Sequence, residues 1–163
     1  MTNRVVIENA NMAPSKFRNF SGTETMYNKA GDRNFVIFLN PDQAHELEEV
    51  GAPVSWKPDR YNDGEMRAQL KVHVKYRDRA GNRLTPPNVV LVTSGGQTKL
   101  DEETIGTLDT AEIVNCDLIL NVYDYTSPMG SGKSAALKTM YVTIAEDELA
   151  RKYRDQSEDG LPF

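Results

Sequence analysis

The sequence has few of the residues that form disulfides and metal sites. Among 163 residues there is one cysteine, Cys116, and there are two histidines, His45 and His73. A single cysteine excludes an internal disulfide and is typical of proteins from a reducing compartment. Because Cys116 lies in an apolar run, we expect a buried structural thiol. Neither histidine has a partner at metal-ligand spacing, so we expect no metal and no cofactor.

Long apolar runs are also missing. No stretch approaches the roughly 18 residues of a membrane-spanning helix. The first residues lead into only Val5, Val6 and Ile7, which is too short for a signal-peptide core. With 39% apolar and 26% charged residues, the composition is typical of a soluble globular protein. We therefore expect a cytoplasmic protein without a membrane segment, with one domain over residues 1–155 and a flexible tail over residues 156–163.

Positive charge is scarce overall but is concentrated early in the chain. The formal net charge is −5, which is unfavourable for binding phosphates. Residues 1–40 contain five basic and three acidic residues, and residues 57–83 contain eight basic and four acidic residues. Residues 84–163 contain six basic and thirteen acidic residues. The two early stretches would together form one positive face on an otherwise acidic molecule.

Several runs predict strands. Residues 34–39 are apolar after Asn34, which indicates a strand buried on both faces, and residues 89–93 are interpreted in the same way. Residues 70–77 alternate strictly, with apolar residues at the even positions, so they predict a half-buried strand with a basic outer face. Residues 94–96 are interpreted as a flexible break. A long strand over residues 113–126 is expected to form a hairpin with residues 135–144 through a turn at 127–132.

Two helices are predicted. Asn40 is a suitable N-cap, Pro41 fits the first turn, and Gly51 provides the stop. A second helix is expected from Ala145 to about Arg154, with acidic residues in its first turn and basic residues in its last. The chain is therefore mainly β, with about seven strands, one internal helix and one C-terminal helix. A partly open β-barrel of the oligonucleotide-binding (OB) type and a two-sheet sandwich both fit this pattern.

Aromatic and basic residues occur close together in the first 83 positions, which contain 8 of the 13 aromatic residues and 13 of the 19 Lys and Arg residues. Single-stranded DNA offers charged phosphates and flat base faces, so interleaved cations and rings are the chemistry that binds it without sequence preference. The predicted DNA-binding residues are Lys16, Phe17, Arg18, Phe20, Tyr27, Arg33, Trp56, Lys57, Arg60, Tyr61, Lys71, His73, Lys75 and Arg77.

Several of these assignments have a structural alternative. The alternative for the basic positions of residues 70–77 is a solvated strand face, and Trp56 and Tyr61 would equally be structural. We interpret Phe35, Phe38 and Tyr76 as core residues because their neighbours or their strand face are apolar.

Two motifs that resemble catalytic sites are interpreted as non-catalytic. Residues 130–134, Gly-Ser-Gly-Lys-Ser, resemble a phosphate-binding loop, but Ser127 occupies the position of its first glycine and a strand-like run follows. The acidic residues 101–103 lie in a polar connector, which is more typical of a solvated surface than of a metal-dependent nuclease. We therefore expect a protein that is not an enzyme.

The last seven residues combine acidic side chains with an apolar tip. A peptide of this length cannot bury its own aromatic ring, so the ring would be available to a pocket rimmed by Arg or Lys on another protein. An ordinary frayed terminus is the alternative. The predicted partner-binding residues are Glu158, Asp159, Leu161, Pro162 and Phe163.

This acidic ending with a final Pro-Phe resembles the C-terminus of bacterial single-stranded DNA-binding proteins, where it recruits replication and repair enzymes. The runs 17–22, 31–35 and 137–144 resemble a single-stranded DNA-binding protein of tailed phages. The tail departs from the bacterial pattern in having only Glu158 and Asp159 beside the tip. The resemblance implies the OB-like barrel rather than the sandwich. It also implies sequence-independent DNA binding in phage replication, recombination or repair, with proteins of those processes as partners of the tail.

Two other functions fit the same sequence. A structural β-protein of a virion, without DNA binding, would have a similar acidic surface and long strands. A protein-interaction adaptor would use the tail alone. A preference for unpaired over duplex DNA would distinguish single-stranded DNA binding from both of these functions. The sequence is also compatible with a homo-oligomer.

Overall fold

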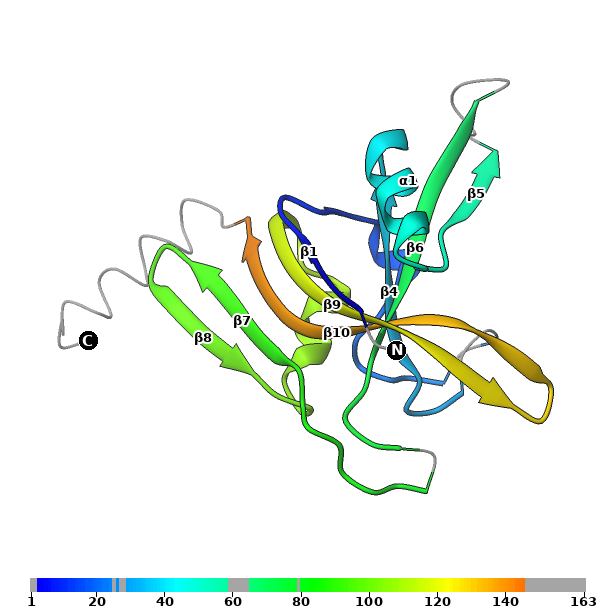
Figure 1. Cartoon of the computed structure of the whole chain (residues 1–163). Helices are drawn as coiled ribbons and strands as arrows, with labels where there is room; N and C mark the ends of the chain where they lie inside the picture. Colours follow the sequence, from blue (N-terminus) through cyan, green and yellow to red (C-terminus); the bar gives the residue numbers. More distant parts are fainter. Residues whose placement is uncertain (1–2, 25, 27–28, 59–64, 79, 146–163) are drawn as a thin grey trace, which may run out of the picture.

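The computed structural model describes residues 3–24, 26, 29–58, 65–78 and 80–145. Within these ranges the protein is mainly β, with one α-helix, as predicted (Figure 1). The predicted helix over residues 145–154 and the tail lie outside the described residues, apart from Ala145. The elements in chain order are β1 (Asn3–Ile7), β2 (Asn11–Met12), η1 (Ser15–Phe17), β3 (Arg18–Asn19), β4 (Arg33–Leu39), α1 (Pro41–Glu49), β5 (Ser55–Pro58), β6 (Met66–Val74), β7 (Asn88–Thr93), β8 (Gly96–Leu100), η2 (Ile105–Asp109), β9 (Ile113–Ser127) and β10 (Gly130–Ile144).

The strands form one curled sheet rather than two stacked sheets. The order along the sheet is β1-β9-β10-β6-β4-β2. β9 pairs with β10 and β4 pairs with β6 in antiparallel fashion, whereas β10 and β6 are parallel, with Ala136 opposite His73. The N–H of Ala10, between β1 and β2, donates to the carbonyl oxygen of Cys116 in β9 at 2.7 Å. The chain before β2 therefore returns to β9, which makes the sheet a partly open barrel.

β10 changes partners along its length. Its first half lies beside β6, whereas residues 139–143 pair with β7 in parallel. The register with β9 shifts between Leu137 and Thr139, so Lys138 lies in a β-bulge. A bulge bends its strand, and here it separates the half of β10 that belongs to the barrel from the half that carries the β7–β8 hairpin. The predicted hairpin of residues 113–144 is confirmed, with a tighter turn at Pro128 and Met129.

The core lies inside the barrel and combines the inward faces of β4, β6, β9 and β10. Each fully buried aliphatic or aromatic side chain contributes about 1.5–3 kcal/mol to stability. Two residues of η2, Ile105 and Leu108, are completely buried and anchor the segment between β8 and β9 in this core. The largest fully buried side chains in the strands of the barrel are Phe35, Ile37, Leu70, Val72, Leu118, Leu120, Met140 and Val142.

Cys116 contributes to this core. Its side chain is fully buried, and burial raises the pKa of the thiol to about 12. The thiolate therefore does not form near neutral pH, and the prediction of a structural cysteine is confirmed.

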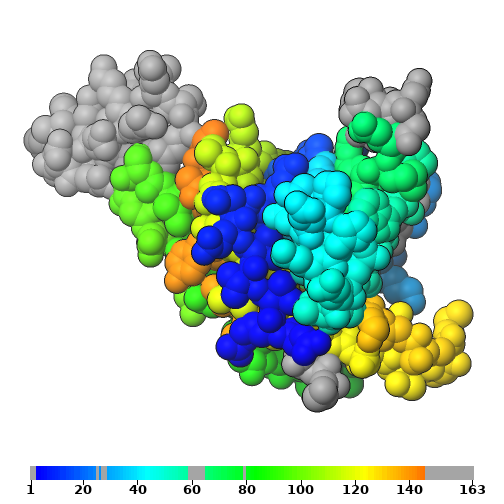
Figure 2. Space-filling view, turned by 45° about the horizontal axis from the view of Figure 1, so that its top comes forward, coloured from blue at the N-terminus to red at the C-terminus, as the bar shows by residue number. Residues whose placement is uncertain are grey.

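The start of α1 is where the sequence predicts it. The side chain of Asn40 accepts the N–H of Gln43 at 2.8 Å, and the side chain of Gln43 accepts the N–H of Asn40 at 3.1 Å. This capping box satisfies two otherwise unpaired donors, and such a cap contributes about 1 kcal/mol. Ala44 and Leu47 are buried, and the helix lies beside β1 on one face of the molecule (Figure 2). Within the described residues, no helix combines the length and apolar character needed to cross a membrane.

The prediction for residues 89–96 is wrong in two respects. β7 has only one fully buried residue, Val89, because its second neighbour, β8, is an added strand outside the barrel. Residues 94–96 are not a flexible break, since Thr93 pairs with Gly96 and the turn between them closes a hairpin. β8 was not predicted because its residues are almost all polar and exposed and show no alternation.

Candidate nucleic-acid interface

The outward side of β6 carries the basic side chains that the alternation predicts. Leu70, Val72 and Val74 are buried. Lys71 and Lys75, on the other side, are exposed, and His73 between them is half-buried. At about 3.3 Å per residue, the basic positions from Arg67 to Lys75 span about 26 Å of surface. This length is sufficient for several nucleotides.

Aromatic rings lie beside one end of this row. Phe38 of β4 is half-buried, and the guanidinium carbon of Arg67 lies 4.5 Å from the centre of its ring. Phe17 meets Phe38 edge-on, with 6.1 Å between ring centres, and is 37% exposed. The ammonium of Lys16 lies 5.1 Å from the centre of the Phe17 ring. The prediction that Phe38 is a core residue is therefore wrong, because it points to the outer side of β4 together with Val36 rather than inward with Ile37.

A tyrosine lies at the other end of the row. The ammonium of Lys75 donates to the hydroxyl of Tyr123 in β9 and lies 4.9 Å from the centre of that ring. Lys57 of β5 is exposed and lies opposite Arg67 in the antiparallel register of β5 and β6. We define the β6 face as the surface formed by Lys16, Phe17, Phe38, Lys57, Arg67, Lys71, His73, Lys75 and Tyr123.

Three members of the β6 face were not predicted, namely Phe38, Arg67 and Tyr123. Arg67 precedes the stretch that alternates most clearly, although it has the same parity as Lys71. Tyr123 is recognisable only once β9 is known to lie across β10 from β6, which requires contacts between residues far apart in the sequence.

Arg18 lies away from the β6 face and supports the fold. Its guanidinium donates to the carbonyl oxygens of Ala13 at 2.9 Å, Leu108 at 3.1 Å and Ala111 at 2.6 Å. Burial lowers the pKa of this group, although the nearby carboxylate of Asp109 opposes the shift. Because its donors are used in three carbonyl bonds, Arg18 holds the segment around η2 against β3.

Phe20 and Arg33 also have structural contacts. Phe20 is completely buried and stacks on Phe35, with ring centres 4.9 Å apart and planes at 20°. Arg33 donates to the carbonyl oxygen of Phe20 at 2.5 Å and lies 5.3 Å from the centre of the Tyr76 ring. In this structure neither side chain lies beside Lys71.

Trp56 and Arg77 lie outside the β6 face. Trp56 is opposite Ala68, whose side chain is in the core, and its ring is 5.6 Å from that of His45 in α1. Arg77 follows the end of β6 and pairs with Glu102 at 3.0 Å. The other predicted positions, Tyr27, Arg60 and Tyr61 and the five tail residues, lie outside the described part of the chain.

The motifs interpreted as non-catalytic have structural roles. The Gly-Ser-Gly-Lys-Ser run is part of β10, and Lys133 donates to Asp124 at 2.6 Å, so it does not form a phosphate-binding loop. Asp101 accepts the N–H of Thr104 at 3.0 Å and its hydroxyl at 2.9 Å, which fixes the turn before η2. Over the ranges that the structure describes, no three His, Cys, Asp or Glu residues are grouped as a metal site would need.

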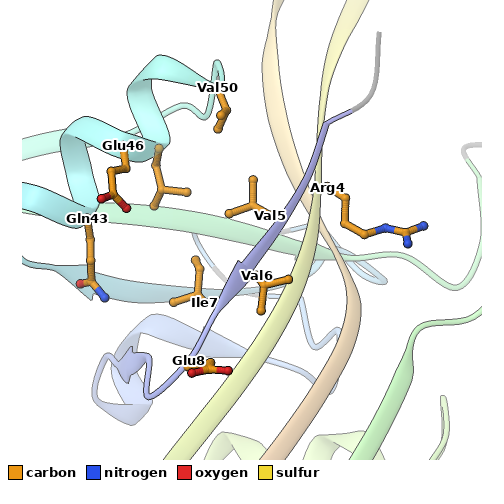
Figure 3. A pocket seen from close by; sticks show the side chains of 9 residues that line it. Arg4, Val5, Val6, Ile7, Glu8, Gln43, Glu46 and Val50 are labelled. Carbon is orange, nitrogen blue, oxygen red and sulfur yellow. The ribbon is translucent and has the colours of Figure 1, made fainter.

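A groove lies between β1 and α1 (Figure 3). It is lined by Val5, Ile7 and Val50, together with Arg4, Glu8 and Glu46. Two carboxylates against one guanidinium would repel a phosphate backbone, so this groove is a poor site for nucleic acid.

The environment of His73 makes the stability of the protein depend on pH. Burial lowers the pKa of its imidazole below 6.5, Lys71 and Lys75 lower it further, and Asp32 opposes them. The unfolded chain therefore binds a proton as the pH falls below about 6.5, whereas the folded protein does so only at lower pH. We expect the free energy of unfolding to decrease between about pH 7 and pH 5.5.

The substitution His73→Gln should reduce the change of the unfolding free energy with pH over this interval. Urea unfolding at several pH values measures the effect. Asp78, Asp101 and Asp124 have pKa values lowered below 3.8 by hydrogen bonds, so they remain ionised throughout and do not contribute. An unchanged pH profile in the variant would exclude His73 as the source.

Three of the solved structures that resemble this chain are of a protein from bacteriophage Enc34. The C-terminally truncated single-stranded DNA-binding protein of this phage has a TM-score of 0.54 at 6% identity, over 88% of this chain and 87% of that chain. The protein without truncation has a TM-score of 0.53 at 8% identity, over 96% and 89%. The same protein in complex with single-stranded DNA has a TM-score of 0.50 at 9% identity, over 88% of each chain. At such low identities the likeness establishes the fold, an OB-like barrel.

The family follows from the sequence itself. The phage ssDNA-binding domain family matches residues 2–160, and the chain belongs to this family. The resemblance to phage single-stranded DNA-binding proteins is thereby confirmed, as is the prediction that the protein is not an enzyme. No curated protein sequence matches the chain.

Proposed function

We propose that the protein binds single-stranded DNA without sequence preference through the β6 face. The observation that carries this proposal is the row of Arg67, Lys71 and Lys75 with a ring at each end. Within the described residues, no acidic side chain pairs with Lys71 or Lys75, so both charges are available to phosphates. By contrast, Arg77 and Lys133 are paired with carboxylates.

The expected binding energies favour a local DNA site although the protein as a whole is acidic. Stacking contributes about 1–3 kcal/mol per base, and two or three rings of the β6 face would therefore outweigh a modest repulsion from the net charge of −5. The repulsion is screened beyond about 10 Å at moderate salt, whereas the contacts of Lys71 and Lys75 act at short range. The Enc34 protein, which has the same fold, is known in complex with single-stranded DNA.

Competition between unpaired and duplex DNA tests the proposal. A fluorescent oligo-dT should bind with increased anisotropy, and unlabelled oligo-dT should displace it far better than a duplex of equal length. The binding should weaken with added salt, because phosphate contacts release counterions. Absence of binding to oligo-dT in dilute buffer would exclude the proposal and favour a virion structural protein.

We assign the body to residues 1–155 and a partner-binding tail to residues 156–163. In this proposal the protein acts in the host cytoplasm during phage DNA replication, recombination or repair, and Glu158, Asp159, Leu161, Pro162 and Phe163 recruit proteins of those processes. The chemistry that supports it is a terminal aromatic next to carboxylates, which suits an apolar pocket rimmed by Arg or Lys.

Deletion of residues 157–163 should raise DNA affinity at low salt and leave it nearly unchanged at high salt. The reason is that the acidic tail competes with DNA for the cations of the β6 face, and salt screens this competition. Anisotropy titrations of the full-length and shortened proteins at two salt concentrations measure the difference. Equal affinities at low salt would show that the tail does not compete with DNA.

A further inference from the structure

The β9–β10 hairpin continues beyond the barrel and forms an arm. β9 and β10 remain paired as far as Ser127 and Gly130, and the hairpin extends away from the other strands (Figure 1). Met129 at its tip is 97% exposed. We call residues 123–134 the arm.

One ring of the arm lies across the backbone of the neighbouring strand. Tyr125 is directly opposite Gly132 in the antiparallel register. A Cβ atom added at Gly132 would lie 2.7 Å from the hydroxyl oxygen of Tyr125, 2.8 Å from its Cζ and 3.0 Å from its Cε1. Contacts this short essentially never occur, so the Tyr125 ring occupies the space that a side chain at position 132 would need. The ring rests on β10, and the residue is still 45% exposed.

The position of this ring extends the β6 face. Tyr123 and Tyr125 are two residues apart in β9, so their side chains leave the strand on the same side, about 7 Å apart. Tyr123 already contacts Lys75 of β6. On the other side of the arm, Lys133 and Asp124 form an ion pair at 2.6 Å, so that side has little net charge.

We propose that Tyr125, seated on Gly132, is a base-stacking platform, and that bound DNA continues from the β6 face onto the arm. Gly132 is then a positioning residue, because its missing side chain is what lets the ring lie flat. This inference rests on the proposed function, since it assigns a further contact to the same DNA strand. The ligand is an unpaired base, whose flat face can lie against the exposed face of the ring.

The first test is the affinity of tyrosine variants for oligo-dT. Loss of one stacked base weakens binding about 5- to 150-fold, so this is the expected effect of Tyr125→Ala. Tyr125→Phe should bind nearly as well as the original protein, because the ring is retained. Tyr141→Ala is the matched control, since Tyr141 is 41% exposed and lies in the other half of β10, opposite Asp117. It should leave affinity unchanged.

The second test is a double-mutant cycle with Gly132→Ala. This change should weaken DNA binding in the original protein but should have no further effect in the Tyr125→Ala background, because the ring that it displaces is absent there. Thermal unfolding of each variant shows whether the barrel is intact. Photo-crosslinking to iodouracil-substituted oligo-dT should label Tyr125 in the original protein and lose that label in the Gly132→Ala variant.

The outcomes separate this inference from the proposed function. If the original protein binds oligo-dT and Tyr125→Ala binds it equally well, the platform is excluded while the β6 face remains. Additive effects of Gly132→Ala and Tyr125→Ala would exclude the positioning role of the glycine. If the original protein does not bind oligo-dT, the proposed function itself is wrong.

Discussion

Replacing Lys71 and Lys75 together with glutamine is expected to weaken binding of oligo-dT about 10- to 100-fold at low salt, because each charge-assisted phosphate contact contributes about 1.5–3 kcal/mol in a desolvated site and less where water reaches it. The two ammonium groups lie on the same side of β6 and are exposed. Their loss removes two phosphate contacts and leaves the core of the barrel unchanged.

The salt dependence makes this result specific. For single-stranded DNA, each phosphate contact contributes about 0.7 to the slope of log affinity against log salt, so the double variant should lose about 1.4 from the slope. Anisotropy titrations between about 0.05 and 0.3 M salt measure it. The variants Lys71→Gln and Lys75→Gln should each lose about 0.7 from the slope, and Lys99→Gln is their charge-matched control. Lys99 lies in β8, away from the β6 face (Figure 1), so its replacement should leave the slope unchanged. An undiminished slope in the double variant would show that the phosphates are held elsewhere.

Phe20→Ala is expected to reduce the free energy of unfolding by about 3–5 kcal/mol, because removal of a buried ring loses its transfer energy and leaves a cavity. Phe20 has no exposed surface and stacks on Phe35. Phe17 is the natural comparison, since it lies on the other side of Arg18 in the sequence and is 37% exposed. Phe17→Ala should reduce stability much less. It should weaken DNA binding by the free energy that one stacked base contributes, about 1–3 kcal/mol.

Urea unfolding and oligo-dT binding should be measured on both variants at a temperature where each is folded. Phe20→Leu is a second variant that keeps most of the buried volume, so it remains folded if Phe20→Ala does not. For Phe20→Leu we expect a smaller loss of stability and unchanged DNA affinity. A large loss of DNA affinity with unchanged stability in Phe20→Leu would mean that Phe20 contacts DNA after all.

Features that depend on neighbours in the sequence were predictable. The basic row on β6 follows from strict alternation over residues 70–77, and the start of α1 follows from Asn40 and Pro41. Both depend on interactions within a few residues. The charge asymmetry between the first 83 residues and the remainder also agrees with the position of the basic side chains of β6.

Features that depend on strand pairing were not predictable. Phe17 and Phe20 have the same local context, yet one lies on the surface and the other in the core, because β3 pairs with β4 and places Phe20 against Phe35. Tyr123 joins Lys75 only through the order β9-β10-β6. The sequence indicated the chemistry of the site but not which rings surround the cations.

The bulge at Lys138 has a practical consequence. The half of β10 after it carries the β7–β8 hairpin, so that hairpin is attached to the barrel at a distance from the strand that bears Lys71 and Lys75. The turn at residues 94–95 is therefore a suitable place to attach a fluorophore or an affinity peptide. A reporter there would follow the protein along a DNA strand without occupying the proposed DNA-binding surface.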